Sequence, residues 1–307
     1  MPLVPAKNIL LKAYREGYAI GAFNFVNMEM LQAILQTANN LRAPVIIQAS
    51  EGAISYAGLS TIVSMARTLA GEVDIPVALH LDHGHKLETI RACIQAGFTS
   101  VMIDASHLPY AENAALTRQV VEIARQSGVS VEAELGRLMG VEDTVSVAER
   151  DAVLVDPEEA GRFVRETDID SLAPAVGTSH GAFKYKGAAR LDLERLKKVK
   201  EKTGIPLVLH GASSIPADLL QEAIGSGIPI GEAKGVPLEE VQKAIKVGVA
   251  KVNIDTDLRL GFVSAMRRIL AEKPETFDLR KILGPAREKV AQIIADRIQA
   301  LGCADRV

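Results

Sequence analysis

Short apolar runs recur along this chain, and each is followed by a segment with the apolar spacing of a helix. Strands that alternate with helices predict a parallel sheet, because each crossover helix returns the chain to the same end of the sheet. A doubly wound sheet is one such fold, but no Gly-x-Gly-x-x-Gly turn follows the first run. The eight runs are Ala19–Asn24, Val45–Ser50, Val77–His83, Ser100–Ser106, Ser130–Gly136, Ser171–Gly177, Leu207–Ser213 and Lys251–Asp257.

Eight strand–helix units in 307 residues fit a closed barrel. We therefore predict an α/β fold, a single (β/α)8 TIM-barrel domain over residues 1–307, with extra C-terminal helices and long active-site loops. The two long connections are Arg137–Asp156 and Thr178–Ala189, and loops of this length are often lids. Helical spacing is clear in Met28–Leu41, Leu87–Ala96, Leu191–Thr203, Leu258–Ala271 and Pro285–Leu301, with Gly97 and Gly204 as expected C-caps.

The charge balance excludes some classes of partner. The net charge is −3, so nothing indicates nucleic acid or an anionic membrane surface. The N-terminus lacks the apolar core of a signal peptide, and no apolar run is long enough to span a bilayer. With only Cys93 and Cys303, a disulfide framework is not expected. We expect a soluble, cytoplasmic protein.

Polar side chains gather at the predicted C-terminal ends of the strands, where TIM barrels carry their active sites. Any one of them also fits a helix cap or a hydrogen-bonded core residue. Their joint placement on one rim favours a functional site. They are Asn24, Ser50, Asp82, His83, Asp104, Glu134, His180, His210, Asn253, Asp255 and Thr256.

Three histidines end a strand or open the loop after it: His83, His180 and His210. Three imidazoles that converge form an open zinc site, with one position left for substrate. Asp82, next to His83, suits general acid–base work, although a carboxylate there also serves to orient a histidine. His80 lies within its strand and is expected to fill the barrel interior. The carboxylates that end the fourth and fifth strands, Asp104 and Glu134, are candidates for a second metal position or for orienting the histidines.

Backbone N–H groups that bind phosphate need glycine and small residues around them. Two segments meet this need, Gly177–Gly181 and Gly211–Ser214, and Lys184 adds a positive charge. Asp255-Thr256-Asp257 opens a helix in the manner of an N-cap. The region after the seventh and eighth strands is also the recurrent phosphate site of this fold.

Together these motifs resemble the class II, zinc-dependent fructose-bisphosphate aldolases of the shorter-chain branch. The resemblance spans essentially the whole chain, to Asp278-Leu279-Arg280. The combination is specific, although no single piece of it is. The matching elements are Gly21–Asn24, Ser50–Gly52, His80–Gly84, Ser130–Gly136, Gly177–Gly181, Leu209–Ser213 and Lys251–Asp257.

The resemblance implies a role for each site residue. The catalytic Zn²⁺ would be bound by His83, His180 and His210. Asp82 would exchange the proton of the C4 hydroxyl, Glu142 would move the C3 proton of dihydroxyacetone phosphate, and Asn253 would help zinc to stabilise the enediolate. The ketose phosphate, with Na⁺ or K⁺ nearby, would be held by Gly181, Gly211, Ser213, Asp255 and Thr256. Candidates for the second phosphate are Ser50, Lys251, Arg259 and, from a neighbouring subunit, Arg280.

The implied reaction is the reversible cleavage of fructose 1,6-bisphosphate to dihydroxyacetone phosphate and glyceraldehyde 3-phosphate, a lyase step of glycolysis and gluconeogenesis, in a homodimer or homotetramer. Tagatose 1,6-bisphosphate, which differs at C4, is the alternative substrate. A Schiff-base aldolase would need a lysine at the catalytic end, but Lys251 begins its predicted strand and Lys184 lies on a loop. A metal-dependent barrel hydrolase usually has a His-x-His pair on its first strand, where this chain has Phe23-Asn24. A non-catalytic binding barrel would be expected to lack the catalytic acid or some of the metal ligands.

Overall fold

The computed structural model describes residues 3–137, 139–142, 145–147, 153–177, 179–180, 191–230 and 235–307. Eight parallel strands close into a barrel in the order β1-β11-β10-β8-β5-β4-β3-β2, which confirms the predicted fold class. Every residue of these strands is buried, as expected where helices cover the outside and side chains fill the interior. The strands are β1 Ile20–Asn24, β2 Val45–Ser50, β3 Val77–Gly84, β4 Ser100–Ile103, β5 Ser130–Leu135, β8 Ser171–Pro174, β10 Leu207–Leu209 and β11 Val249–Ile254.

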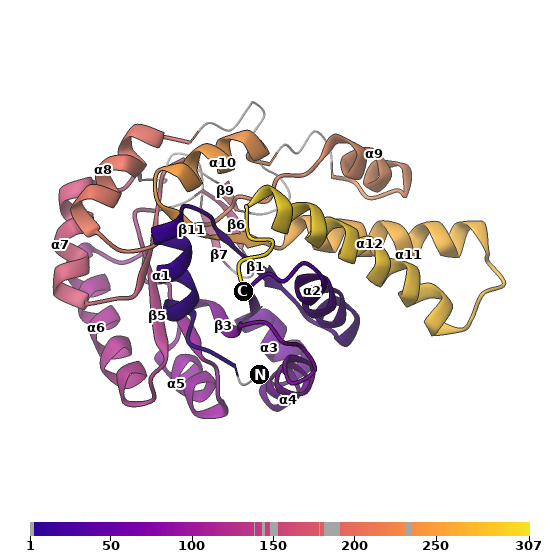
Figure 1. Cartoon of the computed structure of the whole chain (residues 1–307), viewed down its shortest axis with the longest axis horizontal. Helices are drawn as coiled ribbons and strands as arrows, with labels where there is room; N and C mark the ends of the chain where they lie inside the picture. The colour runs from indigo at the N-terminus through magenta and orange to yellow at the C-terminus, as the bar shows by residue number, and fades with distance from the viewer. Residues whose placement is uncertain are drawn as a thin grey trace.

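The helices surround the barrel (Figure 1). They are α1 Ala6–Glu16, α2 Met28–Asn40, α3 Glu51–Ala57, α4 Leu59–Ala70, α5 Leu87–Ala96, α6 Tyr110–Gln126, α7 Pro157–Thr167, α8 Leu193–Thr203, α9 Ala217–Gly225, α10 Leu238–Lys246, α11 Thr256–Glu272 and α12 Leu279–Ala300. Gly97 and Gly204 end their helices with φ of 107° and 66°, so both predicted C-caps are confirmed. The predicted start at Pro285 is wrong. Helix α12 begins at Leu279, because the Asp278 side chain caps it by accepting from the Arg280 N–H.

The predicted eighth strand, Lys251–Asp257, is displaced from the observed one. Strand β11 starts at Val249 and ends at Ile254, so Lys251 lies inside the strand rather than at its start. The Lys251 side chain is only 1% exposed. A charged residue in a buried strand is costly, and this is why the sequence pattern placed the boundary there.

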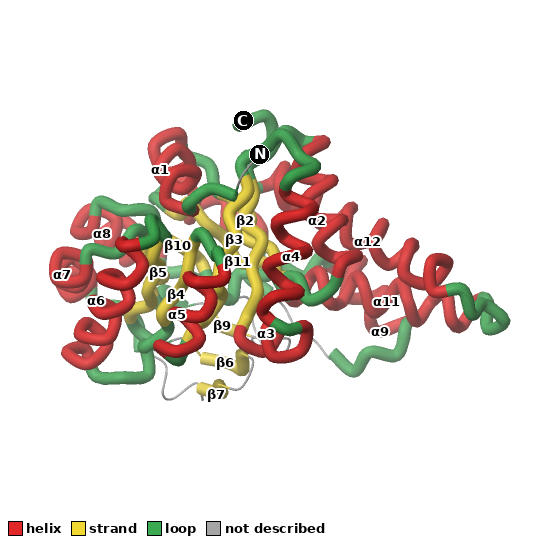
Figure 2. Tube along the Cα trace, turned by 90° about the horizontal axis from the view of Figure 1, so that it is seen from below, coloured by secondary structure: helices red, strands yellow, loops and turns green. Residues whose placement is uncertain are grey.

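The two long connections contribute a second, smaller sheet. Its strands are β6 Met139–Glu142, β7 Val145–Val147 and β9 Ser179–His180. Strand β6 pairs with β7 in antiparallel fashion and with β9 in parallel fashion, with Gly140 opposite His180. In Figure 2 this sheet lies beyond the end of the barrel at which β2 leads into α3. The backbone that carries Glu142 is therefore next to the backbone that carries His180, beyond this end of the barrel.

Helices α11 and α12 pack against each other and extend away from the barrel as an arm (Figures 1 and 2). Gly261 lies at their contact, where a Cβ would come within 2.4 Å of Ile293 Cδ1, so a larger residue would displace the isoleucine side chain. The turn between them exposes Phe277 (91% exposed), at the outer end of the arm where α12 begins.

Among the described helices, none has both the length and the apolar character needed to cross a bilayer.

Candidate active site

The end of β3 brings two consecutive polar side chains into the barrel. Neighbouring residues in a strand normally face opposite sides, yet Asp82 and His83 are both buried. The pairing of β3 with β4 shifts register between Leu81 and Gly84, and His83 has a φ of 47°. This left-handed conformation is uncommon for a residue other than glycine and is found at bulges and functional sites. The bulge turns His83 towards Asp82, with Nε2 of the histidine 3.9 Å from Oδ1 of the aspartate.

Gly84 explains why the chain can turn so tightly here. A Cβ at this position would lie 2.7 Å from the Met102 carbonyl oxygen and 2.9 Å from Ile90 Cγ1. Both distances are shorter than ordinary contacts, and the Met102 oxygen belongs to the backbone of β4. A larger residue would push β3 away from β4 and move the bulge, so the glycine in the predicted motif has a packing role.

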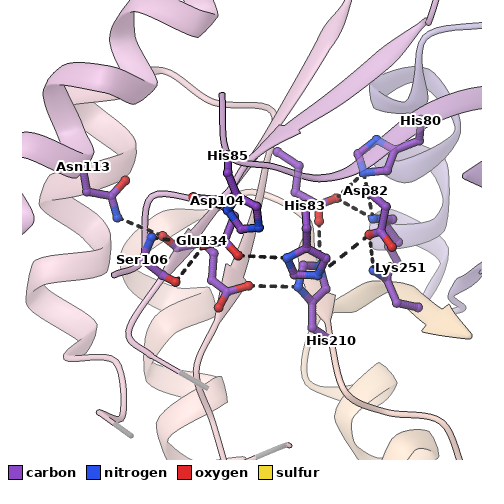
Figure 3. A network of polar contacts seen from close by, with 12 residues as sticks. His80, Asp82, His83, His85, Asp104, Ser106, Asn113, Glu134, His210 and Lys251 are labelled. Carbon is purple, nitrogen blue, oxygen red and sulfur yellow. Dashed lines mark hydrogen bonds and ion pairs between the residues drawn. The ribbon is translucent and has the colours of Figure 1, made fainter. Parts of the chain in front are cut away.

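Two of the three predicted zinc ligands face each other inside the barrel mouth. The rings of His83 and His210 lie 4.6 Å apart, and each has a carboxylate on its Nδ1 (Figure 3). Asp104 Oδ2 lies 2.9 Å from Nδ1 of His83, and Glu134 Oε2 lies 3.0 Å from Nδ1 of His210. His83, Glu134 and His210 each offer a ligand atom, and these atoms lie within 4.8 Å of one another. Imidazoles oriented by carboxylates are the usual environment of a protein-bound metal, so the donor set fits one.

The electrostatics of this cluster also favour a cation. Burial opposes the charged form of His83, but the carboxylates of Asp82 and Asp104 raise its pKa to about 9. Burial, together with the charge of Asp104, raises the pKa of Glu134. Burial acts the same way on Asp104, but the hydrogen bond and charge of His83 lower its pKa. Without a metal, the charged His83 imidazole helps to balance these carboxylates, a role that a divalent ion would take over.

Two amides hold Asp82 in place. The Asn24 side-chain N–H donates to Oδ2 at 2.8 Å, and the Asn253 side-chain N–H donates to Oδ1 at 2.9 Å. Gln48 donates in turn to the Asn24 side-chain oxygen at 2.7 Å, which fixes the orientation of that amide. Burial would raise the pKa of Asp82, but the cationic groups around it, His83 first and then Lys251, lower it. Asp82 is therefore an oriented, ionised carboxylate that can accept a proton.

A cleft of about 340 Å³ opens beside Asn24 at the rim. This volume suits a small-molecule ligand. Polar groups in its wall include Ser50, which ends β2, and Asp255 and Arg259 at the start of α11. The Arg259 Nε donates to Asp255 Oδ1 at 2.8 Å, and the arginine side chain is 62% exposed. The wall of the cleft thus includes the exposed Arg259 guanidinium and also Asn24, whose side-chain amide donates to Asp82.

The other predicted phosphate residues occupy the same end of the barrel. Gly211 has a φ of 59° in the loop that follows β10, and Ser213 is buried in that loop. Thr256 is the first residue of α11. Arg280 is not brought to this site within the chain, because it belongs to the outer end of the arm, where its exposed side chain binds Asp278.

Some predicted residues lie outside what the structure describes. Gly181 and Lys184 are among the undescribed residues, and for His180 and Glu142 only the backbone is described. Their predicted roles in metal binding, proton transfer and phosphate binding are therefore not tested.

The sequence profile of the family "Fructose-bisphosphate aldolase class-II" matches residues 4–229 and 232–306. The chain belongs to this family. A Helicobacter pylori protein named fructose-bisphosphate aldolase is 53% identical over 306 residues, which cover 99% of this chain and 100% of that one. A Thermus caldophilus protein of the same name is 48% identical over 304 residues, with 99% of both chains covered. The crystal structure of the YdjI aldolase from Escherichia coli K12 superposes with a TM-score of 0.81 at 29% identity and covers 99% of both chains.

Membership of the class II aldolases decides between the alternatives raised by the sequence. As a family these enzymes depend on a metal, commonly zinc, so a Schiff-base aldolase, a hydrolase and a non-catalytic barrel are set aside. The structure agrees on the lysine, because Lys251 is buried against Glu132 inside the barrel. For the same reason, the suggestion that Lys251 binds the second phosphate is wrong.

Sequence reasoning missed part of the aldolase site. It assigned no role to Glu132 or Gln48. It placed Asn24 among the polar residues at the strand ends but gave it no specific role. A signal was present, because residues two apart in a strand face the same side. Glu134 and Asn253 were recognised as facing the barrel mouth, so Glu132 and Lys251, two residues earlier in β5 and β11, must face the interior just below them.

Proposed function

We propose that this chain catalyses the reversible, zinc-dependent cleavage of fructose 1,6-bisphosphate to dihydroxyacetone phosphate and glyceraldehyde 3-phosphate. The full-length match to the family, and to relatives named fructose-bisphosphate aldolase, supports the activity. The structural observation that carries the assignment is the ionised Asp82, held by two amides and turned towards His83 by the bulge. An oriented base beside a metal ligand is what retro-aldol chemistry needs.

The metal would be held by His83 and His210, with His180 as the third ligand. Bound zinc would polarise the ketone carbonyl as a Lewis acid. Asp104 contacts Nδ1 of His83, which supports an orienting role for this carboxylate. Glu134 lies at Nδ1 of His210 and belongs to the group of atoms that could hold a metal, so a metal-binding role for Glu134 stays a prediction. A second divalent ion at Asp104 and Glu134, and a monovalent cation near the ketose phosphate, stay predictions.

Asp82 would act on the substrate's own hydroxyl. It takes the proton of the C4 hydroxyl, C4 becomes the aldehyde carbon, and the electron pair of the C3–C4 bond passes to C3. The resulting enediolate would be stabilised by Asn253, whose amide already contacts Asp82. Glu142, carried by β6 beside the His180 strand, would then deliver a proton to C3. Aldol condensation follows the same steps in reverse.

The two phosphates would bind in two subsites at this end of the barrel. We assign the ketose phosphate to Gly211, Ser213, Asp255 and Thr256, with Gly181 and Lys184 from the connection that follows β8. We assign the second phosphate to the cleft lined by Ser50 and Arg259. Completion of that subsite by Arg280 from a neighbouring subunit, a homodimer or homotetramer, and a cytoplasmic location are further predictions.

Replacing Asp82 tests the base directly. Asp82→Asn keeps the size of the side chain but removes the proton acceptor, so we expect kcat for cleavage to fall about 10²- to 10⁴-fold. Zinc content should stay at the wild-type value, because Asp82 is not assigned as a ligand. The exposed Asp74→Asn is the matched control and should have normal turnover. Near-normal turnover in Asp82→Asn would contradict the assignment.

The substrate and the metal need their own measurements. Comparing kcat/KM for fructose and tagatose 1,6-bisphosphate tests the choice of substrate, and a strong preference for tagatose would overturn it. Chelation should abolish cleavage, and added Zn²⁺ should restore it. Full activity in metal-free protein would refute the zinc-dependent mechanism.

A further inference from the structure

A buried ion pair lies in the barrel interior directly below the histidines. Lys251 Nζ is 2.8 Å from Glu132 Oε2, and the two side chains are 1% and 2% exposed. Taking both charges out of water is expensive, and the attraction between them offsets that cost only when further hydrogen bonds complete the site. Neither residue touches the proposed substrate positions, so the pair is not explained by the reaction steps above.

The second oxygen of Glu132 connects this pair to the metal site. Oε1 lies 2.8 Å from Nε2 of His210, while Nδ1 of the same ring lies 3.0 Å from Glu134 Oε2. A neutral imidazole has one N–H donor and one nitrogen that can bind a metal. The nitrogen whose N–H donates to a carboxylate is the one that the metal does not use. The two carboxylates therefore decide which nitrogen of His210 remains for the metal.

The environment of the two carboxylates distinguishes them. Glu134 belongs to the group of ligand atoms that also includes His83, so Nδ1 of His210 is on the metal side. Glu132 is on the opposite side of the ring and already has the Lys251 ammonium on its other oxygen. One oxygen of Glu132 thus contacts the Lys251 ammonium, and the other is placed to accept from the His210 Nε2–H.

The interior beyond Lys251 is consistent with this arrangement. Lys251 Nζ is also 3.2 Å from His80 Nε2, and His80 Nδ1 is 2.7 Å from Ser100 Oγ. Burial and the Lys251 charge lower the pKa of His80 to about 3, so the ring is neutral. Its Nε2 then accepts from the ammonium, and its Nδ1–H donates to Ser100. Lys251 therefore bridges His80 and Glu132, and this contact helps to fix the orientation of the Glu132 carboxylate.

We propose that Glu132 and Lys251 are positioning residues that hold His210 with its Nε2–H on Glu132 and leave Nδ1 for the metal. The proposal rests on the proposed function only in taking His210 as a metal ligand. Lys251 prevents Glu132 from acting as a competing anionic ligand, and Glu132 supplies the hydrogen bond that orients the ring. The metal affinity of the site therefore depends on residues that contact neither metal nor substrate.

Two double variants separate the hydrogen bond from the charge. Glu132→Gln with Lys251→Met, and Glu132→Leu with Lys251→Met, both remove the ion pair, but only glutamine keeps an oxygen that accepts from His210. Zn²⁺ affinity of each purified protein is measured by competition with a chelator. We expect the glutamine variant to bind within about threefold of wild type and the leucine variant about 10- to 100-fold more weakly. Equal affinities in the two variants would overturn the proposal.

A measurement on the wild-type protein keeps the proposal testable if the leucine variant does not fold. Nitrogen-15 NMR of the histidine rings in the zinc-loaded protein should show His210 protonated at Nε2 and coordinated through Nδ1. Coordination through Nε2 would overturn the proposal without any variant. Neither measurement uses catalysis, so loss of the proposed aldolase activity with the expected NMR pattern would refute the function and leave the positioning role intact.

Discussion

Two buried cation–carboxylate pairs lie near β11. One contacts a residue that we assign to metal binding, and the other contacts the segments that we assign to phosphate binding. Lys251 and Glu132 are side chains of barrel strands, and their link to the site is a hydrogen bond to a metal ligand. Arg297, from the C-terminal helix α12, lies 2.8 Å from Asp257 at the start of α11, with side chains 6% and 0% exposed. Both pairs are buried and have the same 2.8 Å separation, but they differ in what they hold in place.

The outer pair acts on the backbone. Besides Asp257, Arg297 donates to the carbonyl oxygen of Ser214, in the loop that follows β10. One guanidinium thus joins that loop to the first turn of α11, the two segments to which we assign the ketose phosphate. The proposed metal-binding residues are thus positioned by side chains within the barrel, whereas the proposed phosphate-binding segments are positioned by the C-terminal helix α12.

Breaking the interior pair should have the largest effect on stability. Lys251→Met leaves Glu132 as a buried charge without its cation, and we expect the free energy of unfolding of the metal-free protein to fall by about 3–5 kcal/mol. Adding Glu132→Gln removes the uncompensated charge and should recover part of this loss. Urea unfolding of both variants measures the difference. A double variant as unstable as the single one would mean that the pair is not the source of the effect.

Breaking the outer pair should separate phosphate binding from metal binding. Arg297→Met releases the Ser214 carbonyl and the start of α11, so we expect KM for the bisphosphate to rise on the order of tenfold, about 1.4 kcal/mol. Zn²⁺ affinity should be unchanged, because Arg297 has no contact with the histidines or their carboxylates among the described residues. Steady-state kinetics and chelator competition test both statements. A parallel loss of zinc affinity would mean that metal binding and phosphate binding are not independent.

The contrast between the two pairs also shows what the sequence could predict. The eight strands follow from apolar runs and helical spacing, and these are local patterns. His83 and His210 were found because each directly follows or ends such a run. The Lys251–Glu132 pair joins residues 119 positions apart. The sequence therefore predicts Lys251 as the start of a strand, because its buried partner is not visible from local patterns. Arg297 gave no signal, since a basic residue on a helix is ordinarily solvent-exposed.

Other parts of the site depend on local geometry that composition does not reveal. The bulge that turns His83 inward needs a register shift against β4, which follows from pairing and not from the motif itself. The pairing of β6 with β9 brings together two connections that looked like separate loops. The orientation of Asn24 depends on Gln48, a polar residue within a run that the sequence predicts only as a strand.

The smallest expected effect comes from a pair at the surface of the same site. Arg259 and Asp255 form an i,i+4 contact with the arginine 62% exposed, so Arg259→Met should change the free energy of unfolding by at most ~0.5 kcal/mol. Its loss should still raise KM for the bisphosphate about threefold, ~0.6 kcal/mol, because its guanidinium lines the cleft assigned to the second phosphate. Lys243→Met is the matched control, since Lys243 forms a similar exposed pair with Glu240 on α10 and does not line this cleft. If both variants leave KM unchanged, the second phosphate does not bind at Arg259, and the site would then extend towards another face of the rim.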